Sequence, residues 1–243
     1  LERATTLMEV LVTLAPQDLP ARRDLARLDE EQGKWQQALD QWRMVLSLSG
    51  KAVEEDQLSL SRCAIEAGDP DAALDACNQV LTKISDHGLA HTYKGQAFLL
   101  KGMTQEAISH LSRATLLCSD LPKPWIALAE AQQSQGEAQR AVDTLRAAIL
   151  AAPDSSEVHF KLARLLLDQG YLTDALPNLR QAARLSPENV SVTIELADTL
   201  RHLGHLSEAI QVIHEARQRW PKNPHLAYLE GSTFLDLGNP QRA

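Results

Sequence analysis

The segment WIALAEAQQSQGEAQRAVDTLRAAILAAP, residues 125–153, decides the fold of this chain. Apolar residues recur three, four and seven positions apart on both sides of Gly136, which is the spacing of one buried stripe on each of two helices. A glycine can adopt the positive φ that ends a helix and turns the chain, and a proline such as Pro153 prevents a helix from continuing. The segment therefore predicts a helix, a tight turn and a second helix.

This segment is one copy of a repeat. The repeat glycines are Gly33, Gly68, Gly102, Gly136, Gly170, Gly204 and Gly238, and an alanine follows each by five residues, at Ala38, Ala73, Ala107, Ala141, Ala175, Ala209 and Ala243. The residue seven positions before each glycine is always small: Ala26, Ser61, Gly95, Ala129, Ala163, Ala197 or Gly231. The first interval between glycines is 35 residues and the next five are 34. A fixed period of this length indicates a solenoid of stacked two-helix units.

The register also predicts the boundaries of the units. Residues 1–18 are expected to be the second helix of a preceding repeat and its turn, so that the chain is a piece of a longer array. The predicted repeats are 19–53, 54–87, 88–121, 122–155, 156–189 and 190–223, with a partial repeat at 224–243. No linker or shift in composition divides them, and we expect a single solenoid over residues 1–243.

At this point the chain resembles the tetratricopeptide repeat family. Trp125, Leu128, Ala129, Gly136, Ala141, Leu145, Ala148 and Pro153 follow the family pattern in the fourth repeat, whereas Gly50 and Ser85 replace the closing proline in the first two repeats. The resemblance implies an all-α, right-handed superhelical solenoid of helix-turn-helix repeats. It also implies a scaffold that binds a peptide or helix of a partner protein in a concave groove. Two alternatives stay open: a non-catalytic arm of a larger enzyme or secretion component, and end-to-end self-association.

The resemblance further implies which residues face that groove, namely those about ten, nine, six and three positions before each repeat glycine. The candidate partner-binding residues are Arg62, Tyr93, Ile126, Phe160, Lys161, Arg164, Leu167, Ile194 and Arg201. They combine an apolar track with arginines that could hold carboxylates of a peptide. Packing against the next repeat explains the apolar members equally well.

A specialised form of the family grips the acidic tails of chaperones with lysines, asparagines and an arginine at these positions. The corresponding residues here are Leu58, Arg62, Tyr93, Lys123 and Ala127, of which only Lys123 fits. We therefore do not expect a chaperone-tail adaptor.

Composition and motifs argue against other classes of function. The net charge of −8 and the predicted isoelectric point near 5.5 disfavour a nucleic-acid surface, including the pentatricopeptide proteins of similar period. No segment approaches the ~20 apolar residues that span a bilayer. No catalytic motif is present, so we expect neither an enzyme nor a cofactor.

Histidine and cysteine placement predicts no metal site. The pairs His87 with His91 and His202 with His205 lack further ligands at suitable spacing, and we expect them on solvated turns. The three cysteines, Cys63, Cys77 and Cys118, cannot all pair and are expected to act as small apolar residues. This favours a reducing compartment and hence the cytoplasm, with the periplasm as the alternative.

One proline stands inside a predicted helix. Pro177 lies seven residues after Gly170, lacks an N–H group, and crowds the carbonyl of Thr173. Because Thr173 is near the helix start, we expect a distorted first turn rather than a broken helix.

Overall fold

The computed structural model describes residues 2–50 and 53–238, and their regular secondary structure is entirely α-helical. The helices are α1 (Glu2–Leu14), α2 (Leu19–Glu31), α3 (Trp35–Ser49), α4 (Glu54–Ala67), α5 (Pro70–Lys83), α6 (Gly88–Leu100), α7 (Thr104–Leu117), α8 (Pro122–Ser134), α9 (Ala138–Ala151), α10 (Ser156–Asp168), α11 (Leu172–Leu185), α12 (Val190–His202), α13 (Leu206–Arg219) and α14 (Pro224–Asp236). The all-α repeat fold is thus confirmed. The first helix of a repeat is even-numbered and the second is odd-numbered.

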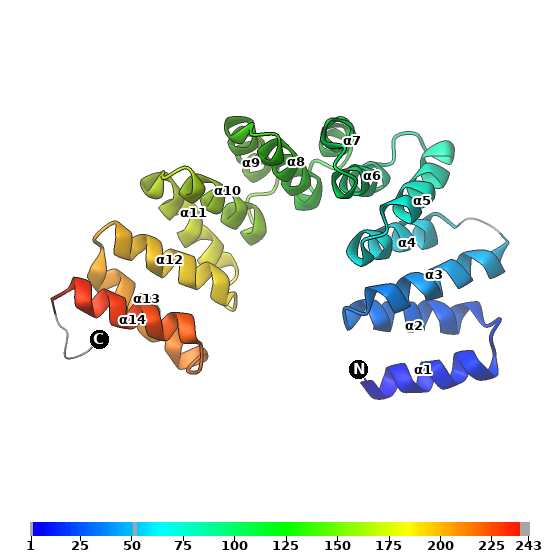
Figure 1. Cartoon of the computed structure of the whole chain (residues 1–243), viewed down its shortest axis with the longest axis horizontal. Coiled ribbons are helices and arrows are strands. Elements are labelled where there is room, and N and C mark those ends of the chain that lie inside the picture. The colour runs from blue at the N-terminus through cyan, green and yellow to red at the C-terminus, as the bar shows by residue number, and fades with distance from the viewer. Residues whose placement is uncertain (1, 51–52, 239–243) are drawn as a thin grey trace. The chain divides into compact units, whose positions relative to one another are not determined.

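The chain divides into two compact units, Leu1–Gly136 and Glu137–Ala243. Unit 1 contains α1 to α8 and unit 2 contains α9 to α14. Within each unit, helices that are consecutive in the sequence pack side by side, as Figure 1 shows for α1, α2 and α3. The first helices of successive repeats also touch: α6 contacts α4 and α8 in unit 1, and α12 contacts α14 in unit 2. The grouping of all repeats into a single solenoid stays a prediction.

The repeat glycines terminate the first helices as the sequence predicts. All seven have a positive φ, between 69° and 80°. At Gly170 the turn is closed by two backbone bonds, Gly170 N to Leu167 O at 2.9 Å and Tyr171 N to Leu166 O at 2.9 Å. This bonding satisfies carbonyls that the end of α10 would otherwise leave open, and it requires the left-handed conformation that glycine adopts without strain.

Within each unit, the core lies where the two helices of a repeat cross. The alanines five residues after the glycines, from Ala38 to Ala209, have no exposed surface, while Ala243 lies outside the described residues. The helices approach closely at Gly95, where an added Cβ would lie 2.5 Å from Cγ of Leu111 and 3.2 Å from the carbonyl oxygen of Ala107. The small residues therefore allow the close helix approach that the sequence predicts. Cys63 and Cys77 are buried in this core as small apolar residues.

In four repeats, the side chain eleven residues before the glycine ties the repeat to the end of the preceding one. The acceptor is the carbonyl six residues earlier: Arg22 Nε donates to Pro16 O at 2.7 Å, His91 Nε2 to Ser85 O at 3.0 Å, Trp125 Nε1 to Ser119 O at 2.9 Å, and His159 Nε2 to Pro153 O at 3.1 Å. These residues differ in chemistry, but each has a side-chain N–H group that reaches across the turn to the carbonyl. The closing carbonyl of a repeat is therefore satisfied whether or not the closing residue is proline.

Pro177 does not break its helix, as expected, while the distortion of the first turn stays a prediction. Helix α11 is continuous through Pro177, and its first turn is closed by a bond from Ala175 N to Tyr171 O at 3.0 Å. The proline cannot donate the helical bond to Thr173 O.

Candidate functional site

The residues predicted to face a groove lie on the first helices of five repeats and are divided between the two units. Unit 1 holds Arg62 on α4, Tyr93 on α6 and Ile126 on α8, and unit 2 holds Phe160, Lys161, Arg164 and Leu167 on α10 with Ile194 and Arg201 on α12. The two sets differ in whether their side chains are already buried or paired with other residues of the fold.

In unit 1, the carboxylate of Glu30 on α2 engages Arg62. Arg62 Nη2 forms an ion pair with Glu30 Oε2, while Glu30 Oε1 accepts from Trp42 Nε1 at 2.7 Å and from the thiol of Cys63 at 3.0 Å. Because Glu30 is largely buried and holds three donors, Arg62 belongs to the packing of α2, α3 and α4. A partner carboxylate would have to displace this ion pair to reach the guanidinium.

The two apolar candidates of unit 1 are also used inside the fold. Tyr93 and Ile126 are both buried, and the ammonium of Lys123 lies 4.7 Å from the centre of the Tyr93 ring. Burial raises the pKa of the Tyr93 hydroxyl, and the nearby Arg62 only partly opposes that rise. For these two residues, packing against neighbouring helices accounts for their placement.

On α10 in unit 2, the predicted residues remain accessible. Phe160, Arg164 and Leu167 are spaced by four and three residues and so share one face of the helix. Phe160 and Leu167 are half-buried, and Arg164 is exposed and forms no ion pair with any described residue. Lys161, which lies beside them in sequence, is half-buried and already interacts with another group.

On α12 the same stripe carries Ile194 and Arg201. Ile194 is half-buried and packs against Ile213 and its neighbours in the core. Arg201 lies between two carboxylates, with Nη2 at 3.0 Å from Asp198 Oδ1 and Nη1 at 3.0 Å from Asp236 Oδ2. Burial lowers the pKa of Arg201, but hydrogen bonds to Asp236 and Asp198 outweigh it and raise the pKa overall. Arg201 therefore joins α12 to α14.

The structure adds two residues that the candidate set lacks. Tyr228 and Leu235 on α14 occupy the same positions before Gly238 that Phe160 and Leu167 occupy before Gly170, and their exposed fractions are 72% and 57%. The repeat register placed both residues at groove positions. The register carries no information on exposure. Exposure distinguishes Tyr228 and Leu235 from buried residues at groove positions, such as Ile126.

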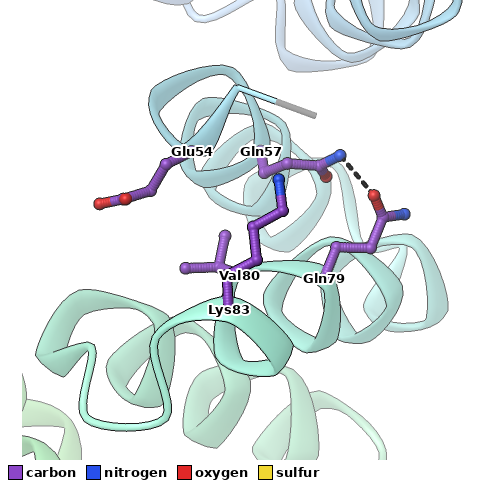
Figure 2. Close-up of a pocket in the computed structure, with 5 residues that line it drawn as sticks. All are labelled: Glu54, Gln57, Gln79, Val80 and Lys83. Atoms are coloured by element: carbon purple, nitrogen blue, oxygen red, sulfur yellow. Dashed lines mark hydrogen bonds between the residues drawn. The ribbon is translucent and has the colours of Figure 1, made fainter. Parts of the chain in front are cut away.

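The cavity between α4 and α5 of unit 1 is too small to hold a small-molecule ligand. Figure 2 shows this cavity, which is lined by Glu54, Gln57, Gln79, Val80 and Lys83. Gln57 and Gln79 close it with a hydrogen bond of 2.8 Å from Nε2 to Oε1. Its volume of about 10 Å³ is at the lower limit for a single water molecule.

The histidines are used in different ways from those expected. His202 and His205 are exposed as predicted, but His91 is buried and contacts His110, which was not among the candidates. His87 caps the start of α6, with Nδ1 accepting from Ala90 N at 3.1 Å and Nε2 lying 2.8 Å from Glu54 Oε1. In the described residues, no group of three or more His, Cys, Asp or Glu side chains is arranged to hold a metal ion. None of the described helices is long and apolar enough to cross a bilayer.

The sequence matches the family model described as "Tetratricopeptide repeat" at residues 58–120, 126–190, 160–224 and 194–243. These matches cover most of the chain. No curated protein matches the sequence.

Several solved structures share the fold at low sequence identity. A thermophilic tetratricopeptide repeat protein of Thermus thermophilus is 20% identical with a TM-score of 0.64, over 75% of this chain and 98% of that one. PilF of Pseudomonas aeruginosa is 13% identical with a TM-score of 0.64, over 88% and 97%. A structure of the APC/C hetero-tetramer Cut9-Hcn1 is 20% identical with a TM-score of 0.60, over 82% of this chain but 39% of that one. These similarities concern the fold alone.

Proposed function

The chain belongs to the tetratricopeptide repeat family, and from this premise we propose that it is a scaffold that binds a peptide or helix of a partner protein. Tetratricopeptide repeats in general mediate protein–protein interactions and are non-catalytic. We place the binding surface on the first helices of unit 2. The unit 2 face is defined here as Phe160, Arg164, Leu167, Ile194, Tyr228 and Leu235.

One observation carries this placement. The three candidate residues of unit 1 are committed to the fold, since Tyr93 and Ile126 are buried and Arg62 is paired with Glu30. In unit 2, Phe160, Leu167 and Tyr228 keep accessible surface, and Arg164, at the position of Arg62, has no ion-pair partner among the described residues. A surface that combines accessible apolar groups with an unpaired charge is typical of a recognition site.

The chemistry of the unit 2 face favours a ligand with two features. Phe160 and Tyr228 are aromatic groups with few rotatable bonds, and such residues commonly anchor an interface. The guanidinium of Arg164 can grip a carboxylate with two parallel hydrogen bonds. We therefore expect a segment that places a large apolar side chain beside an aspartate, a glutamate or a terminal carboxylate.

A library of short random peptides on an array tests this proposal with the full chain. We expect selected peptides to be enriched in an acidic residue next to apolar ones. Phe160→Ala and Arg164→Ala should each weaken binding about tenfold or more, as substitutions of anchor residues do. The control for the anchor is Tyr171→Ala, which removes an exposed aromatic group outside the unit 2 face.

The control for the charge is Arg146→Ala on α9, which removes a guanidinium that is 55% exposed. Peptides that bind all four variants equally well would show that the unit 2 face is not the binding surface. Absence of any enrichment in acidic and apolar residues would contradict the proposed ligand.

Self-association is a second candidate, and a different surface favours it. Helix α1 exposes Leu7 by 71% and Leu14 by 77%. Units of this kind bury their apolar faces against neighbouring units, so an exposed apolar helix face is suited to stacking against another copy. Light scattering over a concentration series should then show a rising average mass, and Leu7→Gln with Leu14→Gln should abolish the rise. A mass that stays at one chain at high concentration would exclude this candidate.

A further inference from the structure

Two histidines face one another between the helices of the third repeat. His91 on α6 and His110 on α7 place their Nδ1 atoms 2.9 Å apart. The two ring planes are inclined at 26° with centroids 5.2 Å apart, and the ring of Phe98 is stacked with that of His110, with centroids 5.5 Å apart and planes inclined at 15°. His91 is buried and His110 is half-buried.

The hydrogen bonds determine where the protons are. Nε2 of His91 lies 3.0 Å from the carbonyl oxygen of Ser85, and since a carbonyl can only accept, this nitrogen carries a proton. In the neutral His91 ring, Nδ1 is then an acceptor. The Nδ1 of His110 must therefore donate to it, which leaves Nε2 of His110 unprotonated.

Acid adds protons that this arrangement cannot place well. A first extra proton goes to Nε2 of His110, which forms no hydrogen bond with a described residue. A second goes to Nδ1 of His91, where it replaces the acceptor with a donor and leaves two N–H groups pointing at each other. Protonation therefore first introduces a charge into the helix interface and then breaks the bond across it.

The surrounding charges do not compensate. Lys94 of α6 and Arg113 of α7 both act against a positive charge on the pair, and the one nearby carboxylate, Asp86 in the turn before α6, is already paired with Arg113. Among the described residues, no charged group of α5 or α8 acts on either ring. The ring of Phe98 presents only its π face to His110. Among the described residues, none offers the pair a hydrogen-bond acceptor for an added proton.

The pKa values agree in direction with this geometry. Burial lowers the pKa of His91, and the bond to Ser85 opposes it only in part. Burial, with Lys94, His91 and Arg113, lowers the pKa of His110 to about 4 from an ordinary value of 6.5. Because the folded pKa is depressed, the unfolded chain takes up protons first as the pH falls below 6.5. Stability is therefore lost progressively between that pH and the folded value.

We propose that the His91–His110 pair is an acid-sensitive joint of unit 1, which loosens α6 from α7 when the pH falls from neutral to about 5. Helix α6 packs against α4 and α8 as well as α7, and it carries Tyr93 on its groove side. Loosening of α6 would therefore change the first-helix surface of unit 1. The proposal is independent of where a partner binds.

Unit 2 contains a natural control at the same position. His159 bonds through Nε2 to Pro153 O at 3.1 Å, and its Nδ1 lies 3.2 Å from Oδ1 of Asn178, which replaces the second histidine. The amide nitrogen of Asn178 donates to Asp174 O at 3.1 Å, so its oxygen faces His159. Both ring nitrogens thus face oxygen acceptors, and an added proton would find a partner.

Hydrogen exchange of the full chain at pH 7 and pH 5, corrected for intrinsic rates, compares the two repeats in one sample. We expect exchange in α6 and α7 to accelerate about tenfold or more relative to exchange in α10 and α11. The variant His110→Asn reproduces the pair that α10 and α11 already contain, and it should abolish the difference. Replacing the exposed His214 with Asn on α13 is the control and should preserve it.

The comparison within the wild-type chain decides the proposal even if His110→Asn does not fold. Equal acid responses of α6–α7 and α10–α11 would overturn it. So would an NMR titration in which the His110 ring takes up its proton near pH 6.5, or a His110→Asn variant that keeps the full acid response of the wild type.

Discussion

Arg23 of α2 and Asp56 of α4 form a bidentate ion pair between the first helices of successive repeats. Nε of Arg23 lies 2.9 Å from Oδ1 of Asp56, and Nη2 lies 2.7 Å from Oδ2. The side chain of Asp56 is only 4% exposed. Arg27 with Glu55 and Arg62 with Glu30 bridge the same two helices. Three ion pairs thus link α2 to α4 in unit 1.

Replacing the buried member of the pair should destabilise unit 1. Asp56→Asn leaves Arg23 without its carboxylate, and we expect a loss of about 1–3 kcal/mol in the free energy of unfolding. Glu55→Gln is the control, because Glu55 is 76% exposed and its pair with Arg27 should contribute less than about 1 kcal/mol. Urea denaturation measures both. Equal effects of the two substitutions would show that burial of Asp56 is not what makes this pair important.

The close approach at Gly95 predicts an effect that changes sign with its neighbour. Gly95→Ala should cost about 1–3 kcal/mol, because the new Cβ would overlap the side chain of Leu111. In a Leu111→Ala background the same substitution should be neutral or stabilising by up to about 1 kcal/mol, since alanine is the better helix former. Thermal unfolding of the double-mutant cycle measures the coupling. Additive effects would contradict the packing described here.

Asp29 should make stability depend on pH. Its side chain is buried, and its Oδ1 has no hydrogen-bond partner among the described residues. Burial raises the pKa of Asp29 above 3.8, with Lys34 opposing and Glu9 adding to the rise. The folded chain therefore loses this proton less readily than the unfolded chain, and ionisation of Asp29 lowers stability at neutral pH.

We accordingly expect Asp29→Asn to stabilise the chain by about 1 kcal/mol at pH 7. The gain should shrink as the pH falls through 4, where the wild-type carboxyl is protonated in both states. Denaturation at several pH values provides the measurement, with the exposed Asp75→Asn as the control. A gain that does not vary with pH would point to a cause other than ionisation.

Pro177 should be a position at which the chain can be stabilised. It lies inside the continuous helix α11 and is exposed, so alanine would restore the missing bond to Thr173 O without crowding a neighbour. We expect Pro177→Ala to raise the free energy of unfolding by about 1–3 kcal/mol. Pro187→Ala, beyond the end of the same helix, should give no such gain. Similar melting temperatures for the two variants would mean that α11 tolerates the proline without cost.

The turns and the core could be predicted from the sequence because they depend on single residues in a fixed register. A glycine at each turn and a small residue at each helix crossing are local requirements. Every repeat of the sequence meets them. At Pro177 the sequence is informative only in part. The sequence locates the missing hydrogen bond, but whether the turn bends depends on how α11 is held by its neighbours.

The candidate surface could be predicted only in part. The register placed Ile126, Phe160 and Tyr228 at equivalent positions, ten residues before their glycines, yet Ile126 is buried, Phe160 is half-buried and Tyr228 is exposed. Each outcome depends on which side chains stand on the helices beside it. A repeat pattern specifies a position on a helix but not the neighbours that cover it.

By itself, the sequence determined the helix-turn-helix repeat, the glycine turns and the alanine-lined core, because these follow from backbone conformation and side-chain size at regular spacing. Only the tertiary structure decided that Arg62 pairs with Glu30, that His91 meets His110, and that Arg164 is left unpaired by the described residues. The reason is physical. The group that a long polar side chain contacts on another helix depends on the length and direction of the side chain. Such contacts exist only once the helices are packed.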